Sequence, residues 1–288
     1  ALGCQFELSG GYIHGVAHDL HGADIQLDMP TVTGTENILM AATLARGTTR
    51  IMNAAREPEV VDLCNFLISL GARIEGAGTS TLTIEGVSRL RPATRAYRVM
   101  PDRIETGTYL CAAAIAGGEV TVTDTDPELL TATLQKLEEA GCEVSTTPTS
   151  ITVRRDGPLK PFRLRTEPHP GFPTDMQAQL MAVATCAEGA SVIEETIFEN
   201  RFMHAAELRR MGADIICEGP MAVVRGRKRL DGAPVMATDL RASACLVAAG
   251  LVANGVTEIR RIYHLDRGYD RIEDKLTSLG ARIQRVQA

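Results

Sequence analysis

The sequence predicts an α/β fold made of repeated units, and two series of glycines carry this prediction. In the first series an apolar residue precedes the glycine and Ala or Cys follows it, with spacings of 68, 70, 71 and 68 residues: Gly3, Gly71, Gly141, Gly212 and Gly280. The second series, spaced by 71, 71 and 66 residues, comprises Gly47, Gly118, Gly189 and Gly255. Such periods are too long for a solenoid repeat and fit a subdomain that contains a βαβ motif.

Each glycine of the second series follows an alanine-rich segment that we expect to be a helix. Ala and Leu favour helix, and a glycine just past the last turn is a common C-terminal cap. An alternating, strand-like segment comes after each glycine. The expected helices span residues 37–45, 107–116, 176–187 and 242–253, and the expected strands span 49–53, 119–123, 191–195 and 257–261.

A second helix should lead to each later glycine of the first series. Asp126 and Pro127 mark one start, as N-cap and first helical residue, and Pro58 marks another. Two more are expected at 203–211 and 269–279. Hairpins pairing 73–75 with 81–85 and 214–217 with 222–225 should follow, with Gly and Pro in their turns. Each unit then has the order helix, strand, helix, strand, strand.

Three segments fall outside this repeat. Residues 91–102 carry two prolines between units and are a candidate hinge, and residues 158–173 carry five prolines and are expected to form a long functional loop. The first glycine signature, at Gly3, has no helix before it. We therefore expect that the chain begins within a repeat and lacks an amino-terminal part.

Composition limits the classes of function. The net charge of −6 argues against a nucleic-acid partner, and 4% aromatic residues without tryptophan argue against stacking platforms for bases or sugars. Seven scattered cysteines without a CxxC pair are expected to be reduced core residues rather than disulfides or metal ligands. We find no signal peptide and no membrane-spanning apolar run, so we expect a cytoplasmic protein. We also expect neither a metal nor a cofactor, because no metal-ligand spacing is found.

Residues that differ between units should carry the function. Four such loops, 27–34, 101–107, 172–177 and 237–243, lie at expected helix N-termini, where free N–H groups and the helix dipole favour an anion. Asp102, Asp175 and Asp239 could each be a simple N-cap. Because they occupy equivalent positions in successive units, we favour a shared site.

A second set of loops, between strand and second helix, contributes one arginine per unit. Arg56, Arg201 and Arg267 could be solvated or paired at a helix start, but their shared position favours a common anionic ligand, because guanidinium matches carboxylate and phosphate. His204 and His264 could be general acids or bases. We favour the alternative that each caps a helix or packs beside its arginine. No metal-ligand spacing, P-loop or dinucleotide fingerprint is present.

Six motifs make the chain resemble a known family. They are NAAREPEVVD (53–62), PDRIETGTYL (101–110), HPGFPTDMQAQ (169–179), FENRFMH (198–204), MATDLRAS (236–243) and RIYHLDRGYDRIEDKL (261–276). Together they resemble the UDP-N-acetylglucosamine 1-carboxyvinyltransferases from end to end of the chain. The resemblance implies an α/β fold of repeated βαβαββ units that form two inside-out α/β barrels, the enolpyruvate transferase prism. Residues 1–99 would be the remainder of the first barrel domain, and 100–288 a nearly complete second one.

The resemblance also implies an activity. The family transfers the enolpyruvyl group of phosphoenolpyruvate to the 3′-hydroxyl of UDP-N-acetylglucosamine and releases phosphate, the first committed step of peptidoglycan synthesis. The expected partners are these two substrates and the missing amino-terminal segment, with no nucleic acid and no membrane. Two alternatives stay open: 3-phosphoshikimate 1-carboxyvinyltransferase, against which FENRFMH and FPTDMQAQ argue, and a non-catalytic fragment that binds UDP-sugars.

Site residues follow by resemblance, motif by motif. Asp175 is the expected general base for the sugar hydroxyl, and Asp239 is a carboxylate linked to closure and proton handling. Arg241 and Arg267 would contact the carboxylate of phosphoenolpyruvate. The remaining substrate-binding positions, of which the first five match the UDP contacts, are Ile197, Met29, Pro30, Thr31, Val32, Arg201, Glu57 and Asp102. The stretch at Met29 departs from the commoner Lys-Val-Ser-Val form, which puts a lysine contact to phosphate in doubt.

The family's reactive cysteine lies in a Pro-Gly-Gly-Cys loop, and none of the seven cysteines has that context. The Lys-Asn pair and the Arg-Pro-Val-Asp uridine loop of the family are also absent from this sequence. An addition–elimination needs positive charge at the leaving phosphate and a closed, dry site. We therefore expect that residues 1–288 alone do not turn over.

Overall fold

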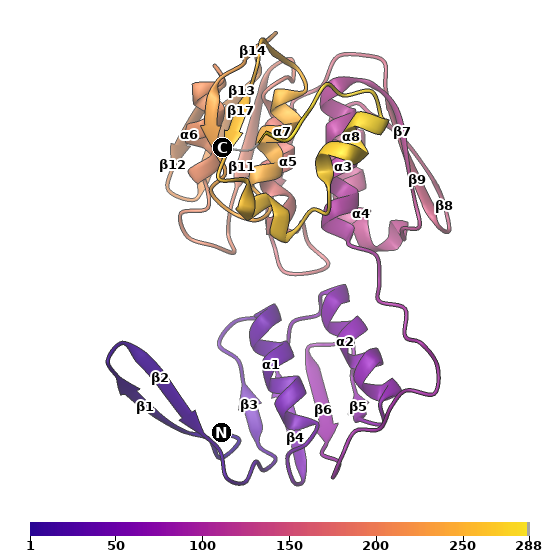
Figure 1. Cartoon of the computed structure of the whole chain (residues 1–288), viewed down its shortest axis with the longest axis vertical. Coiled ribbons are helices and arrows are strands. Elements are labelled where there is room, and N and C mark those ends of the chain that lie inside the picture. Colours follow the sequence, from indigo (N-terminus) through magenta and orange to yellow (C-terminus); the bar gives the residue numbers. More distant parts are fainter. Residues whose placement is uncertain (287–288) are drawn as a thin grey trace. The chain divides into compact units, whose positions relative to one another are not determined.

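The computed structural model describes residues 1–286 and divides into two compact units (Figure 1). The first consists of Ala1–Met100 together with Pro168–Pro170, and the second consists of Pro101–Glu167 and the chain from Gly171 onward. The boundary at Met100 falls in the proline-containing segment 91–102, which has no helix or strand before the helix that begins at Arg103. Each unit is described by itself.

The first unit contains one sheet covered by two helices and a separate hairpin. Its elements are β1 (Gln5–Ser9), β2 (Tyr12–Val16), β3 (Asp24–Gln26), α1 (Val32–Ala42), β4 (Thr48–Met52), α2 (Pro58–Ser69), β5 (Arg73–Glu75) and β6 (Thr81–Glu85). The sheet has the order β3-β4-β6-β5, with β3 parallel to β4 and the other pairs antiparallel. Leu39 of α1, Val60 of α2 and Ile51 of β4 are fully buried between these layers.

The second unit contains three sets of elements. The first set is α3 (Arg103–Ala116), β7 (Gly118–Thr123), η1 (Pro127–Leu130), α4 (Thr131–Glu139), β8 (Glu143–Thr147) and β9 (Ser150–Arg155). The second is β10 (Arg163–Arg165), η2 (Thr174–Met176), α5 (Gln177–Ala184), β11 (Ala190–Glu194), α6 (Met203–Arg210), β12 (Asp214–Glu218) and β13 (Met221–Arg225). The third is β14 (Leu230–Asp231), β15 (Pro234–Met236), α7 (Ser243–Gly250), β16 (Ala253–Asn254), β17 (Glu258–Arg260), η3 (Ile262–Arg267) and α8 (Ile272–Ser278).

The predicted repeat is confirmed in its order and pairing. The sheet β10-β11-β13-β12 repeats the pattern of β3-β4-β6-β5, with a parallel first pair followed by two antiparallel pairs. Both sheets belong to a complete β-α-β-α-β-β set, and β7-β9-β8 lacks only the first strand. The prediction of one long loop over 158–173 is wrong, because β10 lies there. Its neighbouring prolines are tolerated since β10 is an edge strand, where a missing N–H breaks no ladder.

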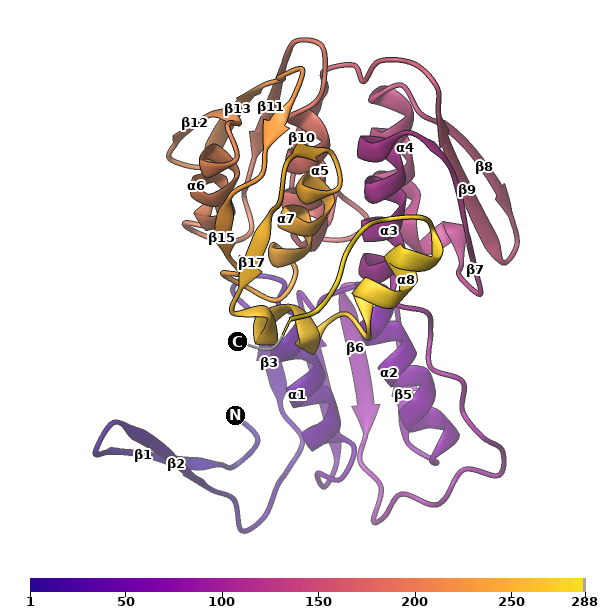
Figure 2. The ribbon, with the colours of Figure 1, turned by 45° about the horizontal axis from the view of Figure 1, so that its top comes forward.

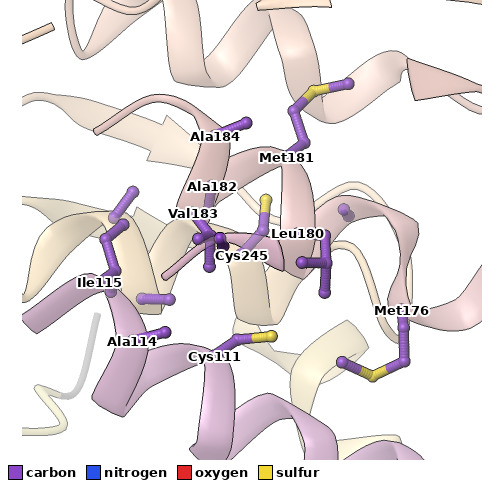
Figure 3. Packing of buried hydrophobic residues seen from close by; sticks show 14 of the residues in the cluster. Cys111, Ala114, Ile115, Met176, Leu180, Met181, Ala182, Val183, Ala184 and Cys245 are labelled. Carbon is purple, nitrogen blue, oxygen red and sulfur yellow. The ribbon is translucent and has the colours of Figure 1, made fainter. Parts of the chain in front are cut away.

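The centre of the second unit is formed by α3, α5 and α7, which pack against one another with the strands outside them (Figures 1 and 2). All eight residues of α5 are buried, so this helix has no solvent-facing side. Alanine and other small side chains allow the helices to approach closely, and Cys111 and Cys245 fill space between them (Figure 3). Burial raises the pKa of both thiols, which keeps them protonated. All seven cysteines are free, and four are buried.

Candidate functional site

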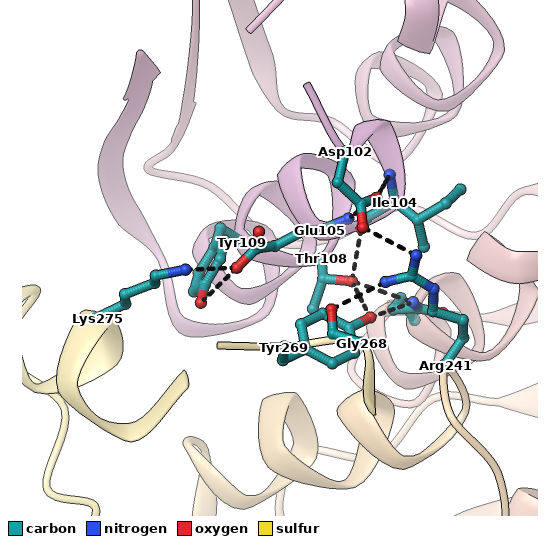
Figure 4. Close-up of polar contacts among 10 residues, drawn as sticks. Asp102, Ile104, Glu105, Thr108, Tyr109, Arg241, Gly268, Tyr269 and Lys275 are labelled. Atoms are coloured by element: carbon teal, nitrogen blue, oxygen red, sulfur yellow. Dashed lines mark hydrogen bonds and ion pairs between the residues drawn. The ribbon is translucent and has the colours of Figure 1, made fainter. Parts of the chain in front are cut away.

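The N-terminal ends of the central helices bring the predicted acidic and basic residues together. Arg241, in the turn before α7, donates from Nη2 to Asp102 Oδ2 at the start of α3, 2.9 Å away (Figure 4). Its Nη1 donates to the carbonyl of Gly268 at 3.1 Å, and the guanidinium lies 5.4 Å from the ring centre of Tyr269. One arginine therefore connects three loops that are far apart in the sequence.

The pKa of Arg241 is raised above its usual value. Burial lowers its pKa, but Asp102, Tyr269 and Asp175 raise it by more, so the net direction is upward. Its Nε is buried and has no hydrogen-bond partner among residues 1–286. The group is a permanent cation whose buried Nε–H is not yet paired within these residues.

Asp102 also caps the start of α3, and Asp239 caps the turn that precedes α7. Asp102 Oδ1 accepts from the backbone N–H groups of Ile104 and Glu105, at 2.8 and 3.0 Å. Asp239 Oδ1 accepts from those of Arg241 and Ala242, at 2.8 and 2.7 Å. The simple capping interpretation is thus correct for one oxygen of Asp102, whose second oxygen accepts from Arg241, whereas Asp239 caps the turn before α7 rather than the helix itself.

Tyr269 is held against α3 and α5 by a buried polar network. Its hydroxyl lies 2.8 Å from Thr108 Oγ1 of α3, and Gln179 Nε2 of α5 donates to both oxygens, at 3.3 and 3.1 Å. Burial raises the pKa of Tyr269 to about 12, against smaller opposing effects of its hydrogen-bond partners, so the phenol stays protonated. Beside it, Lys275 of α8 donates to Glu105 of α3 at 2.7 Å. These contacts fix the last helix of the unit to the first.

Asp175 lies in η2 and is paired with an arginine rather than used as a cap. Arg201 donates from Nη2 to Asp175 Oδ1 and from Nη1 to Thr174 Oγ1, both at 2.6 Å. Phe198 stacks near the same guanidinium, with 5.0 Å from Cζ to the ring centre. The Asp175 side chain is 42% exposed, and its Oδ2 accepts no hydrogen bond from residues 1–286. An oriented carboxylate with one free oxygen can accept a proton from a bound hydroxyl.

Glu195, which the sequence reasoning missed, holds Thr174, the second residue to which Arg201 donates. Its buried carboxylate accepts from Thr174 and Thr166 hydroxyls at 2.8 and 2.9 Å, and from the backbone N–H groups of Ile197 and Phe198 at 2.9 and 3.1 Å. Four donors compensate for the burial of the charge. A glutamate immediately after the apolar strand Ser-Val-Ile-Glu was the available signal.

His204 lies near both groups of charges. The ring is buried beside Phe202 at the start of α6, and its Nε2 has no partner among the described residues. Burial lowers its pKa to about 4, opposed by the nearby Asp239 and aided by Arg201. The imidazole is therefore neutral near pH 7, in agreement with a packed rather than catalytic histidine.

This neutral histidine makes stability depend on pH. Below pH 6.5 the unfolded chain takes up a proton that the folded chain refuses until about pH 4, so acidification through this window should cost about 3 kcal/mol of unfolding free energy. Denaturant titrations at pH 7 and pH 4 should show that loss in the wild type and not in His204→Gln. His14→Gln, at an exposed position, is the control. Equal pH slopes in all three proteins would contradict the assignment.

The other predicted residues of the second unit, within residues 1–286, form no hydrogen bond with the ion pairs described above. Arg267, at the end of η3, is exposed and has no hydrogen bond or ion pair to residues 1–286, and Ile197 is half-buried. His264 was expected beside Arg267, but its Nε2 lies 3.2 Å from Arg261 Nη2, and its ring stacks on Tyr263. Arg261, just before η3, has a left-handed backbone with φ of 58°, and its guanidinium contacts both Tyr263 and His264.

In the first unit the predicted residues lie at two helix starts. Thr31 caps α1 by accepting from the Gly34 N–H at 3.3 Å, Val32 begins that helix, and Met29 and Pro30 are exposed. Glu57 precedes α2; its Oε1 accepts from the His169 N–H at 3.3 Å, and its Oε2 is buried without a partner among residues 1–286. Arg56 donates to the His169 carbonyl at 3.0 Å.

Residues 1–286 contain neither a cluster of metal-ligating side chains nor a helix long and apolar enough to cross a membrane. No group of three His, Cys, Asp or Glu side chains is arranged to hold a metal ion. Within the same residues, every helix is too short or too polar to cross a membrane.

Comparisons with known proteins agree on one family. The model of the EPSP synthase (3-phosphoshikimate 1-carboxyvinyltransferase) family matches residues 2–276. The chain is 57% identical, over 99% of its length and 68% of theirs, to the proteins named UDP-N-acetylglucosamine 1-carboxyvinyltransferase of Magnetococcus marinus and Halorhodospira halophila.

Solved structures give the same fold. The crystal structure of the enolpyruvyl transferase NikO from Streptomyces tendae matches with a TM-score of 0.88 and 29% identity, over 98% of this chain and 70% of that one. An EPSP synthase of Acinetobacter baumannii matches with a TM-score of 0.70 and 18% identity, over 97% of this chain and 68% of that one. The second likeness concerns the fold alone.

Proposed function

This chain belongs to the EPSP synthase family of enolpyruvyl transferases, and we propose that it acts as a UDP-N-acetylglucosamine 1-carboxyvinyltransferase. It would transfer the enolpyruvyl group of phosphoenolpyruvate to the 3′-hydroxyl of the sugar nucleotide and release phosphate. This is a cytoplasmic step at the entry to peptidoglycan synthesis. The observation that carries the proposal is 57% identity over nearly the whole chain, combined with a charged site at the helix N-termini.

Asp175 is the group best suited to act as general base. The 3′-hydroxyl must lose its proton as its oxygen attacks C2 of phosphoenolpyruvate, while C3 gains one; C3 then gives up a proton as the C2–O bond to phosphate breaks, which restores the double bond. The free Oδ2 of Asp175 can take the hydroxyl proton, and the pairing of Oδ1 with Arg201 fixes the direction in which Oδ2 points. Asp239 would assist proton handling with its Oδ2, because its Oδ1 is used by the turn before α7.

Arg241 and Arg267 would hold the carboxylate of phosphoenolpyruvate. Arg241 brings a cation whose position is fixed by Asp102 and Gly268, and Arg267 brings a guanidinium free to form a new ion pair. A fork of this kind matches a carboxylate in two hydrogen bonds. Positive charge held in advance also stabilises the negative charge that develops as the reaction proceeds.

Further residues are proposed for the sugar nucleotide. Ile197 and the stretch from Met29 to Val32 are proposed for the UDP part, with Arg201, Glu57 and Asp102 in support. Ile197 is suited to this because Glu195 fixes its backbone. We further propose that residues 1–99 and 100–288 belong to two separate barrel domains of the family's kind.

Phosphate release with defined acceptors tests the proposal. The full-length protein, given phosphoenolpyruvate, should release phosphate with UDP-N-acetylglucosamine and not with shikimate 3-phosphate. The reverse preference would support the 3-phosphoshikimate alternative. Binding of UDP-N-acetylglucosamine by calorimetry without phosphate release would instead support a non-catalytic UDP-sugar-binding protein.

A further inference from the structure

Arg285 binds two carboxylates in the chain segment that contains Arg267. Arg285, near the end of the described chain, donates four hydrogen bonds from one guanidinium. Two go to the carboxylate oxygens of Asp266, at 2.7 and 2.9 Å, and two to those of Glu273, at 2.8 and 3.2 Å. Both oxygens of both carboxylates are thereby occupied.

These two carboxylates lie on either side of Arg267 in the sequence, and Arg267 is the residue that the proposed reaction needs. Asp266 is the immediate neighbour of Arg267 in η3, and Glu273 lies in the first turn of α8. Asp274, in the same turn, is already paired with Arg271. Hydrogen bonds from Arg285 lower the pKa of Asp266 and of Glu273, so both are anionic at neutral pH. Without Arg285 they would be unpaired anions close in sequence to a free guanidinium.

An exposed arginine beside unpaired carboxylates forms an ion pair with them, and a substrate carboxylate must then compete for it. The structure shows the opposite arrangement: the anions are bound by Arg285, and Arg267 has no partner among residues 1–286.

We propose that Arg285 is a positioning residue that keeps Arg267 available for the carboxylate of phosphoenolpyruvate by occupying Asp266 and Glu273. This rests on the proposed function and on the role of Arg267 within it. Arg285 itself would touch neither substrate.

The experiment compares Michaelis constants in the full-length protein. Arg285→Gln should raise the KM for phosphoenolpyruvate about fivefold, the factor by which an ordinary surface ion pair would reduce the free fraction of Arg267. The KM for UDP-N-acetylglucosamine should change less than twofold. Arg282→Gln, which removes the same charge from an exposed position in the same tail, is the matched control and should resemble wild type.

Rescue separates charge control from a merely structural role. In the triple variant Arg285→Gln/Asp266→Asn/Glu273→Gln, no carboxylate is left to capture Arg267, and the KM for phosphoenolpyruvate should return to within about twofold of wild type. Asp266→Asn/Glu273→Gln alone should also stay near wild type, which keeps the test valid even if Arg285→Gln folds poorly.

Two outcomes would overturn this inference and leave the proposed function intact. Arg285→Gln could have the same KM for phosphoenolpyruvate as Arg282→Gln, or the triple variant could fail to restore a raised KM. Absence of phosphate release in the wild type would instead overturn the proposed function, and the inference would fall with it. The wild-type assay distinguishes these cases.

Discussion

Replacing Asp175 with asparagine should lower kcat for phosphate release about 1000-fold, within the range by which a positioned general base accelerates proton transfer. The substitution removes the proton-accepting charge and keeps the shape of the side chain. Asn retains a carbonyl oxygen that can still accept from Arg201, so the arrangement of Arg201 and Thr174 should survive. The KM for UDP-N-acetylglucosamine is expected to change only severalfold.

Asp214→Asn provides the matched control for this experiment. Asp214 is also a partly exposed carboxylate facing an arginine, with 3.4 Å to Arg227, but it lies on β12 away from the helix N-termini. The kcat of the Asp214→Asn variant should equal that of the wild type. If Asp175→Asn kept more than about a tenth of wild-type turnover, Asp175 could not be the general base.

The fold was predictable where the signal is local. Glycine caps and alanine-rich helices recur at fixed spacing, and the structure contains the helices and strands that they indicate. The edge strand β10 was missed because three residues among prolines carry almost no alternation, and its position depends on pairing with β11. Tertiary context decided that segment.

The candidate site was predictable only in part, for the same reason. Asp102, Asp175 and Arg241 stand out because they interrupt the repeat, whereas their supporting residues look like ordinary helix residues. Thr108 and Tyr269 are 161 positions apart, and no local pattern pairs them. Glu195 matters only because two threonines and two backbone N–H groups converge on it. Such networks become visible only when the packing is known.

The repeat also predicts where the fold tolerates no side chain. Gly86 and Gly226 occupy equivalent positions after β6 and β13, and each donates its N–H to the glycine that follows the central helix, Gly47 or Gly189, at 2.9 Å. A Cβ at Gly226 would lie 1.6 Å from the Ala187 carbonyl oxygen, and one at Gly86 would lie 1.5 Å from that of Ala45. The strand runs so close to the helix end that only hydrogen fits.

Gly226→Ala should therefore lower the free energy of unfolding by about 3 kcal/mol or more, because backbone must move to relieve the overlap. Denaturant unfolding at pH 7 measures this loss. Gly157→Ala is the matched control in the same unit, since a Cβ there meets nothing within 4 Å and should change stability by less than about 0.5 kcal/mol. Equal stability of the two variants would show that the strand can separate from the helix end at little cost. A selective loss at Gly226 would show that the close contact between strand and helix end is required in the second unit.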